Sequence, residues 1–277
     1  MSDERETAYA KLNLALHVRR REPDGYHAIE TLFAFCEDGD ELSWADRPGL
    51  IVVGPFAGAL SGEGDNLVLR AARAFAERFG TTEDAGFRLD KRLPVAAGIG
   101  GGSADAAAAL RLLARRHGVD PAAPDLLALA AGLGADVPAC LFSTPTRGTG
   151  RGDALAPLAE ALPALPVLLV NPMQPLATGP VFAAWDGQDR GPLPAGDTLA
   201  AAQAGRNDLE PPARAILPVI GDVVALLGRQ SGMTLARMSG SGATCFALFE
   251  TVEARDAADR AIGTAQPGWW RLSTRLR

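Results

Sequence analysis

The chain has 277 residues, 47% of them hydrophobic, which is enough for two domains with a sizeable core. Its net charge of −6 provides no global basic field, which argues against nucleic acid or an anionic membrane surface as a partner. No apolar run is long enough to span a bilayer, and the acidic first residues are unlike a signal peptide. Because three widely spaced cysteines also indicate a reducing compartment, we expect a cytoplasmic protein.

Residues 8–18 alternate between apolar and more polar side chains, which predicts a strand with one buried face. The other face carries Lys11 and Asn13 side by side. Lys11 is one of only two lysines, the rest of the basic side chains being arginine, so its position inside an apolar strand favours a functional cation over a strand-edge lysine. The second lysine, Lys91, lies beside Arg92 just before a glycine-rich stretch, where an ordinary surface charge is one interpretation.

The pattern then predicts strands over 28–35, 41–44, 50–53 and 87–89, and helices over 66–79, 104–116 and 125–133. Ser103 is the expected N-cap of the helix over 104–116.

Four glycines fall within five positions, Gly98, Gly100, Gly101 and Gly102, directly before that helix. Glycine lets successive N–H groups converge on one point, and a helix N-terminus adds its dipole, so the pattern favours a phosphate-binding turn. The alternative is a flexible turn before a buried helix. The stretch is not a P-loop, because no Gly-Lys-Ser/Thr ends it, and it lacks the last glycine of a dinucleotide fingerprint.

The second half predicts strands over 165–171, 234–238, 244–249 and 270–274, with helices over 213–229, broken at Pro218, and 252–265. This order is the split βαβ pattern, and residues 187–205 read as a loop. The proline-rich stretch 157–166 is the expected boundary between a domain over 1–157 and one over 158–277.

Three further places could carry chemistry. Asp136 is either a turn or capping aspartate or a carboxylate that orients or deprotonates a hydroxyl. His27 is either an ordinary hydrogen-bonded histidine or, with Tyr26, part of a ring-recognition site. The small-residue loop at 239–244, with Gly240 and Gly242, is either a tight turn or a place where backbone approaches a ligand or the first glycine turn.

Together these stretches resemble the GHMP kinase superfamily over nearly the whole chain. Residues 94–104 resemble its central ATP-binding motif, residues 10–14 (Ala-Lys-Leu-Asn-Leu) its first motif, and residues 239–244 its C-terminal glycine motif. Asp-Gly-Tyr-His at 24–27, Gly-Ala-Asp-Val-Pro at 134–138 and Asn-Asp at 207–208 are similar to the branch that phosphorylates the 2-hydroxyl of 4-diphosphocytidyl-2-C-methyl-D-erythritol with ATP, in the non-mevalonate isoprenoid pathway.

The resemblance implies an α+β, two-domain GHMP kinase fold, with a ribosomal S5 domain 2-like N-terminal domain and a ferredoxin-like C-terminal domain. It implies ATP as phosphate donor with Mg²⁺ held mainly by the ATP phosphates, so no metal ligand is assigned in the chain. The expected partner is a small molecule, the cytidine diphosphate-linked methylerythritol, and not nucleic acid or a membrane. We expect a monomer or weak homodimer.

By position, the resemblance implies Lys11 and Asp136 as the catalytic pair. It implies that Asn13 holds the methylerythritol end, His27 bonds cytosine, Tyr26 and Phe182 stack on it, and Thr178 lines the pocket. Asn66 would lie near adenine, and the loop of Gly240 and Gly242 would support the nucleotide turn. The remaining ATP-binding residues implied are Pro94, Val95, Ala96, Ala97, Gly98, Ile99, Gly100, Gly101, Gly102, Ser103 and Ala104.

Two alternatives stay open at this point. The first is another small-molecule GHMP kinase, acting on mevalonate, homoserine or a sugar; Tyr26, His27 and Phe182 speak against it. The second is a non-catalytic ligand-binding or regulatory protein on the same fold, against which the presence of both Lys11 and Asp136 speaks.

Overall fold

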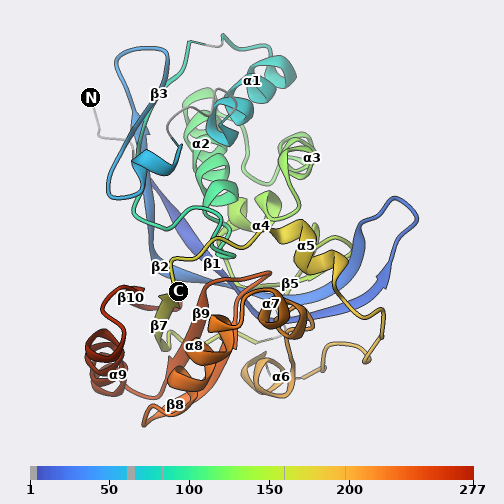
Figure 1. Cartoon of the computed structure of the whole chain (residues 1–277). Helices are drawn as coiled ribbons and strands as arrows, with labels where there is room; N and C mark the ends of the chain where they lie inside the picture. Colours follow the sequence, from blue (N-terminus) through green and yellow to red (C-terminus); the bar gives the residue numbers. More distant parts are fainter. Residues whose placement is uncertain (1–4, 61–65, 83, 159, 197) are drawn as a thin grey trace. The chain divides into compact units, whose positions relative to one another are not determined.

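The computed structural model describes residues 5–60, 66–82, 84–158, 160–196 and 198–277 and groups the chain into two compact units (Figure 1). The first unit comprises Met1–Lys11, Asp38–Val95 and Gly100–Ser143; the second comprises Leu12–Glu37, Ala96–Ile99 and Thr144–Arg277. Two long strands that pair with each other, β1 (Arg5–Arg21) and β2 (His27–Trp44), contribute residues to both units. The acidic residues 1–4 lie outside the described part.

The first unit combines a small sheet with packed helices. The end of β2 pairs antiparallel with β4 (Gly86–Asp90), and β3 (Gly49–Val53) pairs parallel with β4. A 3₁₀ turn, η1 (Ala57–Leu60), follows β3. Four helices pack on one another, α1 (Leu67–Phe79), α2 (Gly101–His117), α3 (Pro124–Leu133) and α4 (Val137–Phe142). The run of alanines in α2 is buried, which allows its neighbours to approach closely.

The helix boundaries follow from their caps. Asn66 caps α1, because its side chain accepts the N–H of Val68 at 2.9 Å, and Gly80 ends the helix with φ +66°. The expected start of α2 at 104 with Ser103 as N-cap is wrong. The helix starts at Gly101, and its N-cap is Gly100, which has φ +65° and no side chain to cap with.

The predicted strands over 28–35 and 41–44 are one continuous strand, β2. Glu-Asp-Gly-Asp at 37–40 has the composition of a turn, but Gly39 lies against the backbone of β1. A Cβ there would sit 2.1 Å from the carbonyl oxygen of Ala8. Glycine is therefore present for a close strand approach and not for a turn.

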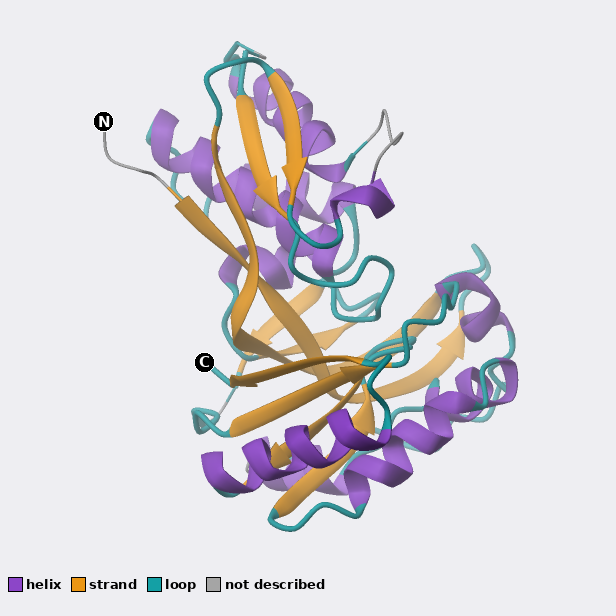
Figure 2. Cartoon of the chain, turned by 60° about the vertical axis from the view of Figure 1, so that its left-hand side comes forward, coloured by secondary structure: helices purple, strands orange, loops and turns teal. Residues whose placement is uncertain are grey.

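The second unit contains the four-stranded antiparallel sheet that the split βαβ pattern predicts. Its order is β10-β7-β9-β8, and Figure 2 shows two helices, α8 (Val219–Gly228) and α9 (Val252–Ala265), along one face. The strands are β7 (Pro166–Asn171), β8 (Met233–Met238), β9 (Cys245–Phe249) and β10 (Trp270–Arg275). The buried core lies between sheet and helices and includes Leu168, Val170, Val223, Phe249 and Ile262.

The same unit holds elements that the sequence pattern did not predict. The first half of β2 pairs with β5 (Thr146–Thr149), which pairs with β6 (Ala154–Pro157). Three short helices connect β7 to α8, namely α5 (Thr178–Ala183), α6 (Thr198–Ala204) and α7 (Glu210–Ile216). The expectation of a loop over 187–205 is wrong for the part that forms α6, whereas the break at Pro218 is confirmed.

Among the described residues, no helix is long and apolar enough to cross a membrane. The boundary at 157/158 stays a prediction.

Candidate functional site

Lys11 and Asp136 form an ion pair, with Nζ of Lys11 3.0 Å from Oδ2 of Asp136. Lys11 projects from β1 and is 4% exposed, whereas the Asp136 side chain is 34% exposed. Asp136 directly precedes α4 but makes no capping hydrogen bond through its side chain. The capping interpretation of this aspartate is therefore not supported, and its carboxylate is held by a buried cation while remaining open to solvent.

The glycine-rich turn packs against this lysine. A Cβ on Gly100 would lie 3.0 Å from Cε of Lys11, and one on Gly101 would lie 3.2 Å from Nζ of Lys91. Gly100 also has φ +65°, a backbone conformation that residues other than glycine rarely adopt. The turn therefore presents bare backbone N–H groups at the start of α2, the geometry that favours an anion such as phosphate.

In the second unit, the residues just before this turn contact the small-residue loop at 239–244. A Cβ on Gly98 would lie 2.4 Å from the carbonyl oxygen of Gly242. The amide of Thr244 donates to the carbonyl of Ala97 at 3.1 Å, and the hydroxyl of Ser239 donates to the carbonyl of Gly98 at 3.1 Å. Of the two interpretations of this loop, the structure supports the close approach to the first glycine stretch.

Two asparagines hold the loop from the other side. The backbone amide of Asn13 donates to Oγ of Ser239 at 3.2 Å, and its side-chain amide donates to Oγ1 of Thr31 at 2.8 Å. Asn207 donates to the carbonyls of Met238 and Gly240, both at 2.8 Å. Asn13 is buried, and its backbone bonds the loop while its side-chain amide bonds the neighbouring strand β2.

Two of the residues expected to recognise a base lie together. The ring of His27 is 5.1 Å from that of Phe182 and 5.7 Å, edge on, from that of Trp185. Burial, with a further contribution from the charge of Arg21, lowers the pKa of His27. Its imidazole is therefore neutral near pH 7, able to donate one hydrogen bond and accept another.

Tyr26 does not join this aromatic group. Its side chain is exposed, and the guanidinium of Arg151 lies 3.9 Å above the ring centroid. Arg151 also pairs with Asp24. The structure thus brings His27 and Phe182 together and places Tyr26 under an arginine.

Thr178 begins α5, the helix that carries Phe182, and its hydroxyl lies 2.9 Å from that of Ser241. This bond joins the start of α5 to the small-residue loop.

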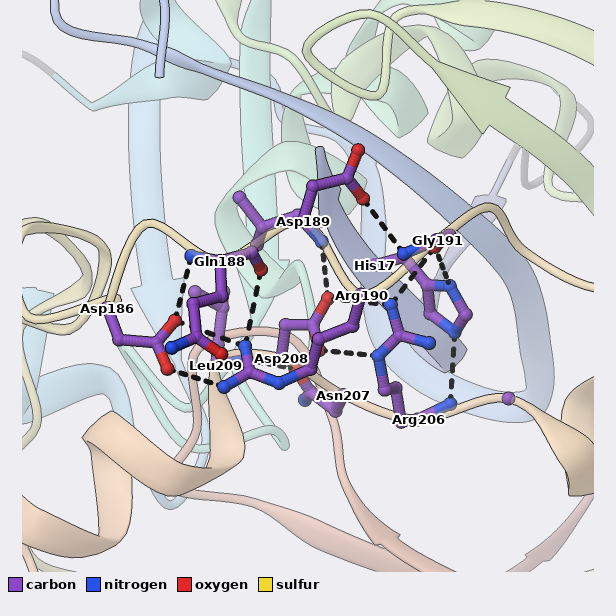
Figure 3. A network of polar contacts seen from close by, with 12 residues as sticks. His17, Asp186, Gln188, Asp189, Arg190, Gly191, Arg206, Asn207, Asp208 and Leu209 are labelled. Atoms are coloured by element: carbon purple, nitrogen blue, oxygen red, sulfur yellow. Dashed lines mark hydrogen bonds and ion pairs between the residues drawn. The ribbon is translucent and has the colours of Figure 1, made fainter. Parts of the chain in front are cut away.

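A polar network fixes the segment that follows α5 (Figure 3). Nε2 of His17 accepts the amide N–H of Arg206 at 3.2 Å, so Nδ1 carries the proton and donates to the carbonyl of Gly191 at 3.1 Å. Arg206 also donates to Gly191 and pairs with Asp208, and Asp189 accepts the amide of Gly191. Burial, followed by the charge of Arg206, lowers the pKa of His17, in keeping with a neutral ring.

The other residues predicted to bind ATP have more varied settings. The side chain of Asn66 caps α1 by accepting the N–H of Val68. Ala96 is exposed with φ +53°, and Gly102 is exposed at the start of α2. The remaining members, Pro94, Val95, Ile99, Ser103 and Ala104, are buried or half-buried around the turn.

Several residues of this region were missed by the sequence interpretation. Lys91 is buried and bonded to two aspartates, so its interpretation as a surface charge is wrong. Arg111 of α2 donates to the carbonyl of Cys140 at 2.7 Å and thereby anchors the helix that follows Asp136. Trp185 received no role. Of these residues, only Lys91 could have been singled out from the sequence, because it is one of just two lysines in a chain rich in arginine.

Comparison with known proteins gives one consistent result. Residues 66–144 match the family described as GHMP kinases N terminal domain, and residues 193–265 match GHMP kinases C terminal. The chain is 62% identical over 276 residues to 4-diphosphocytidyl-2-C-methyl-D-erythritol kinase of Rhizorhabdus wittichii, covering 98% of this chain and 94% of that one. It is 54% identical to the kinase of the same name from Novosphingobium aromaticivorans, covering 99% and 93%. A crystal structure of 4-(cytidine 5'-diphospho)-2C-methyl-D-erythritol kinase matches with a TM-score of 0.82 and 35% identity, covering 99% of each chain.

Proposed function

The chain belongs to the GHMP kinase family, in its 4-diphosphocytidyl-2-C-methyl-D-erythritol kinase branch, and from that premise we propose how its own residues perform the reaction. The activity is the ATP-dependent phosphorylation of the 2-hydroxyl of 4-diphosphocytidyl-2-C-methyl-D-erythritol, which yields the 2-phosphate and ADP. Phosphoryl transfer depends mainly on positioning and on neutralising charge, so the assignment below follows those two needs.

Lys11 and Asp136 form the catalytic pair in this proposal, and their 3.0 Å ion pair is the observation that carries it. Asp136 accepts or orients the proton of the 2-hydroxyl as its oxygen attacks the γ-phosphorus and the bond to the ADP oxygen breaks. Lys11 holds the carboxylate in place and neutralises charge that develops on the transferred group. The partly exposed carboxylate of Asp136 can reach a substrate hydroxyl, and the buried ammonium of Lys11 can hold that carboxylate in place.

The N–H groups at Gly100, Gly101 and Gly102 receive the ATP phosphates. The left-handed backbone of Gly100, with φ +65°, and the helix start directly behind it support this role. We propose that Mg²⁺ is carried mainly by the ATP phosphates, where it would neutralise phosphate charge, because Mg²⁺ gives up its water reluctantly and is commonly bound through substrate phosphates.

His27 and Phe182 read the cytosine ring. A neutral imidazole can match both a donor and an acceptor on the edge of a base, and the neighbouring aromatic side chain offers a stacking face. We assign Asn13 to the methylerythritol end, Thr178 to the pocket wall and Asn66 to the surroundings of adenine. Tyr26 keeps the assignment to base stacking, with the ring face opposite the guanidinium of Arg151. The loop with Gly240 and Gly242 supports the nucleotide turn through its contacts with Gly98.

An assay of ADP release tests the proposal. ATP, Mg²⁺ and 4-diphosphocytidyl-2-C-methyl-D-erythritol should give turnover, whereas mevalonate, homoserine and galactose should not. Asp136→Ala should lower kcat by roughly 10²–10⁴-fold. Asp125→Asn is the matched control, because Asp125 is an exposed aspartate at the start of α3 that pairs with Arg78.

Turnover only with another alcohol would retain the ATP site but reject the roles of His27 and Phe182. Unchanged turnover in Asp136→Ala would reject the catalytic pair.

We also infer a monomer or weak homodimer in the cytoplasm. The three cysteines lie far apart in the sequence and are all buried, which suits small core residues in a reducing compartment. The exposed large hydrophobic side chains, Tyr26, Ile51, Phe142, Met173 and Ile216, come from separate elements. Light scattering across a concentration series would measure the oligomeric state.

A further inference from the structure

Lys91 sits at the centre of a buried cluster of three charges in the first unit. Its Nζ lies 2.6 Å from Oδ2 of Asp40 and 2.6 Å from Oδ2 of Asp105. Lys91 is 2% exposed, and the two aspartates are as deeply buried. The residues come from three different places, the segment after β4, strand β2 and helix α2.

The cluster joins the two ends of the glycine-rich turn. Oδ1 of Asp40 accepts the backbone N–H groups of Arg92 at 2.6 Å and Leu93 at 2.8 Å, which lead into the turn. Asp105 lies on α2, the helix that begins within the turn. Lys91 bonds both carboxylates, so it ties the chain that enters the turn to the helix that leaves it.

The ammonium also lies directly beneath the turn. A Cβ on Gly101 would be 3.2 Å from Nζ of Lys91 and 3.8 Å from Oδ2 of Asp40. Only a glycine at position 101 leaves space for the ammonium here, so the cluster and the backbone of Gly101 are close neighbours. The positions of the N–H groups proposed to receive phosphate therefore depend on how firmly this cluster is held.

Stability alone does not explain the cluster. Removing three charges from water is costly, and well-packed neutral side chains of similar volume are often as stable or more so. Oδ1 of Asp105 is buried and has no hydrogen-bond partner among the described residues, which adds to the cost. Burial raises the pKa of Asp105 to about 7, although the charge of Lys91 acts to lower it. Burial acts to lower the pKa of Lys91, but the charges of Asp105 and Asp40 have the larger effect and raise it.

We propose that Asp40, Lys91 and Asp105 are positioning residues that hold the turn at Gly100, Gly101 and Gly102 in its phosphate-accepting geometry before ATP binds. None of the three touches substrate in this proposal; they act through the backbone that they fix. The proposal rests on the proposed role of this turn in binding ATP phosphates. A preformed turn spares ATP the cost of ordering it, so loss of the cluster should appear chiefly in the KM for ATP.

The decisive variant is the neutral triple change Asp40→Asn, Lys91→Met and Asp105→Asn. It removes all three charges together, keeps side-chain volume, and retains an oxygen at position 40 for the two N–H groups. Its melting temperature should stay near that of the wild type. Its KM for ATP should rise roughly tenfold to a hundredfold while the KM for the cytidyl substrate stays unchanged, because loss of preorganisation affects only the nucleotide.

Arg88→Met is the matched control, since Arg88 is an exposed cation on β4 three positions before Lys91; it should leave both KM values unchanged. A neutral triple variant that folds and has the wild-type KM for ATP would overturn the proposal. If the triple variant does not fold, Asp105→Asn decides instead. It keeps the Lys91–Asp40 pair and should raise the KM for ATP several-fold, and an unchanged value would equally reject the positioning role.

Gly102→Asp separates this proposal from the one on which it rests. Gly102 is exposed, and a Cβ there meets only Cδ1 of Leu67 at 3.5 Å, so the side chain has room and adds a negative charge at the turn. If phosphates bind there, the KM for ATP rises by charge repulsion. An unchanged KM in Gly102→Asp would reject the phosphate site itself, whereas a raised KM there with no effect of the triple change would reject the cluster alone.

Discussion

Cε of Lys11 lies 3.0 Å from the point where a Cβ of Gly100 would be, so this lysine packs tightly against the glycine that precedes α2. The stem of Lys11 passes the bare backbone of Gly100 and ends 3.0 Å from Asp136. A compact ammonium on a thin stem fits this passage, and a planar guanidinium is wider. This offers a physical reason for lysine at position 11 in a chain whose other cations are nearly all arginine.

The first prediction concerns that fit. Lys11→Met and Lys11→Arg should both lower kcat by roughly 10²-fold or more, the first by losing the charge and the second by misplacing it. ADP release under saturating substrates measures kcat. Arg20→Met, which removes an exposed cation from the same strand, should have no effect. Wild-type kcat in Lys11→Arg would contradict the argument from shape.

The second prediction concerns the contact between Gly98 and Gly242. Gly98→Ala adds a Cβ 2.4 Å from the carbonyl oxygen of Gly242 at a residue with φ +75°. Gly118→Ala is the control, because Gly118 has φ +67° but no atom within 4 Å of a new Cβ. The control should lose about 1 kcal/mol from backbone strain, and Gly98→Ala should lose roughly 2–3 kcal/mol or more. Urea unfolding measures both, and equal losses would argue against a tight contact.

The third prediction concerns base recognition by Phe182 and His27. Cytidine 5'-diphosphate should raise the melting temperature of the wild type, and Phe182→Leu should abolish most of this shift, because stacking of one base contributes roughly 1–3 kcal/mol. ATP should protect both proteins equally. Phe79→Leu changes a ring in α1 and should keep the cytidine response. A full cytidine shift in Phe182→Leu would remove this residue from the base site.

The fourth prediction concerns His17 and pH. The pKa of His17 is lowered in the folded chain, so below pH 6.5 the unfolded chain takes up a proton that the folded chain binds less readily. The stability that the folded chain gains from a neutral His17 is therefore fully present above pH 6.5 and is lost progressively as the pH falls below that value. In His17→Gln the group no longer titrates, so the stability advantage of the wild type over this variant should shrink between pH 7.5 and 5. Urea curves at four pH values measure it, and a constant difference would contradict the assignment.

The parts of the fold that could be predicted have local causes. The extent of α1 and the break at Pro218 depend on residues close by in the sequence. The order of β7, α8, β8, β9, α9 and β10 follows from periodicity over each segment. The pairing of Lys11 with Asp136 came from a resemblance between motifs, since 124 residues lie between them in the sequence and no periodicity relates them.

The parts that could not be predicted depend on remote partners. Helix α6 lies in a stretch rich in alanine, glycine and proline, and its last carbonyls are bound by a residue of β8. Arg237 donates to the carbonyls of Ala202 at 2.8 Å and Gly205 at 2.6 Å. The cluster of Lys91 likewise joins residues 40, 91 and 105, which only the folded chain brings within bonding distance. No local pattern contains such information.

The burial of Lys11 and Lys91 has a chemical consequence. The chain has two lysines, and the folded protein buries both, so no lysine amine is on its surface. Reagents that acylate lysine amines should therefore leave these two side chains unmodified until the chain opens. Mass spectrometry of the acylated peptides would then report separately on the opening of strand β1 at Lys11 and of the segment after β4 at Lys91, so that two amines serve as built-in reporters of local unfolding.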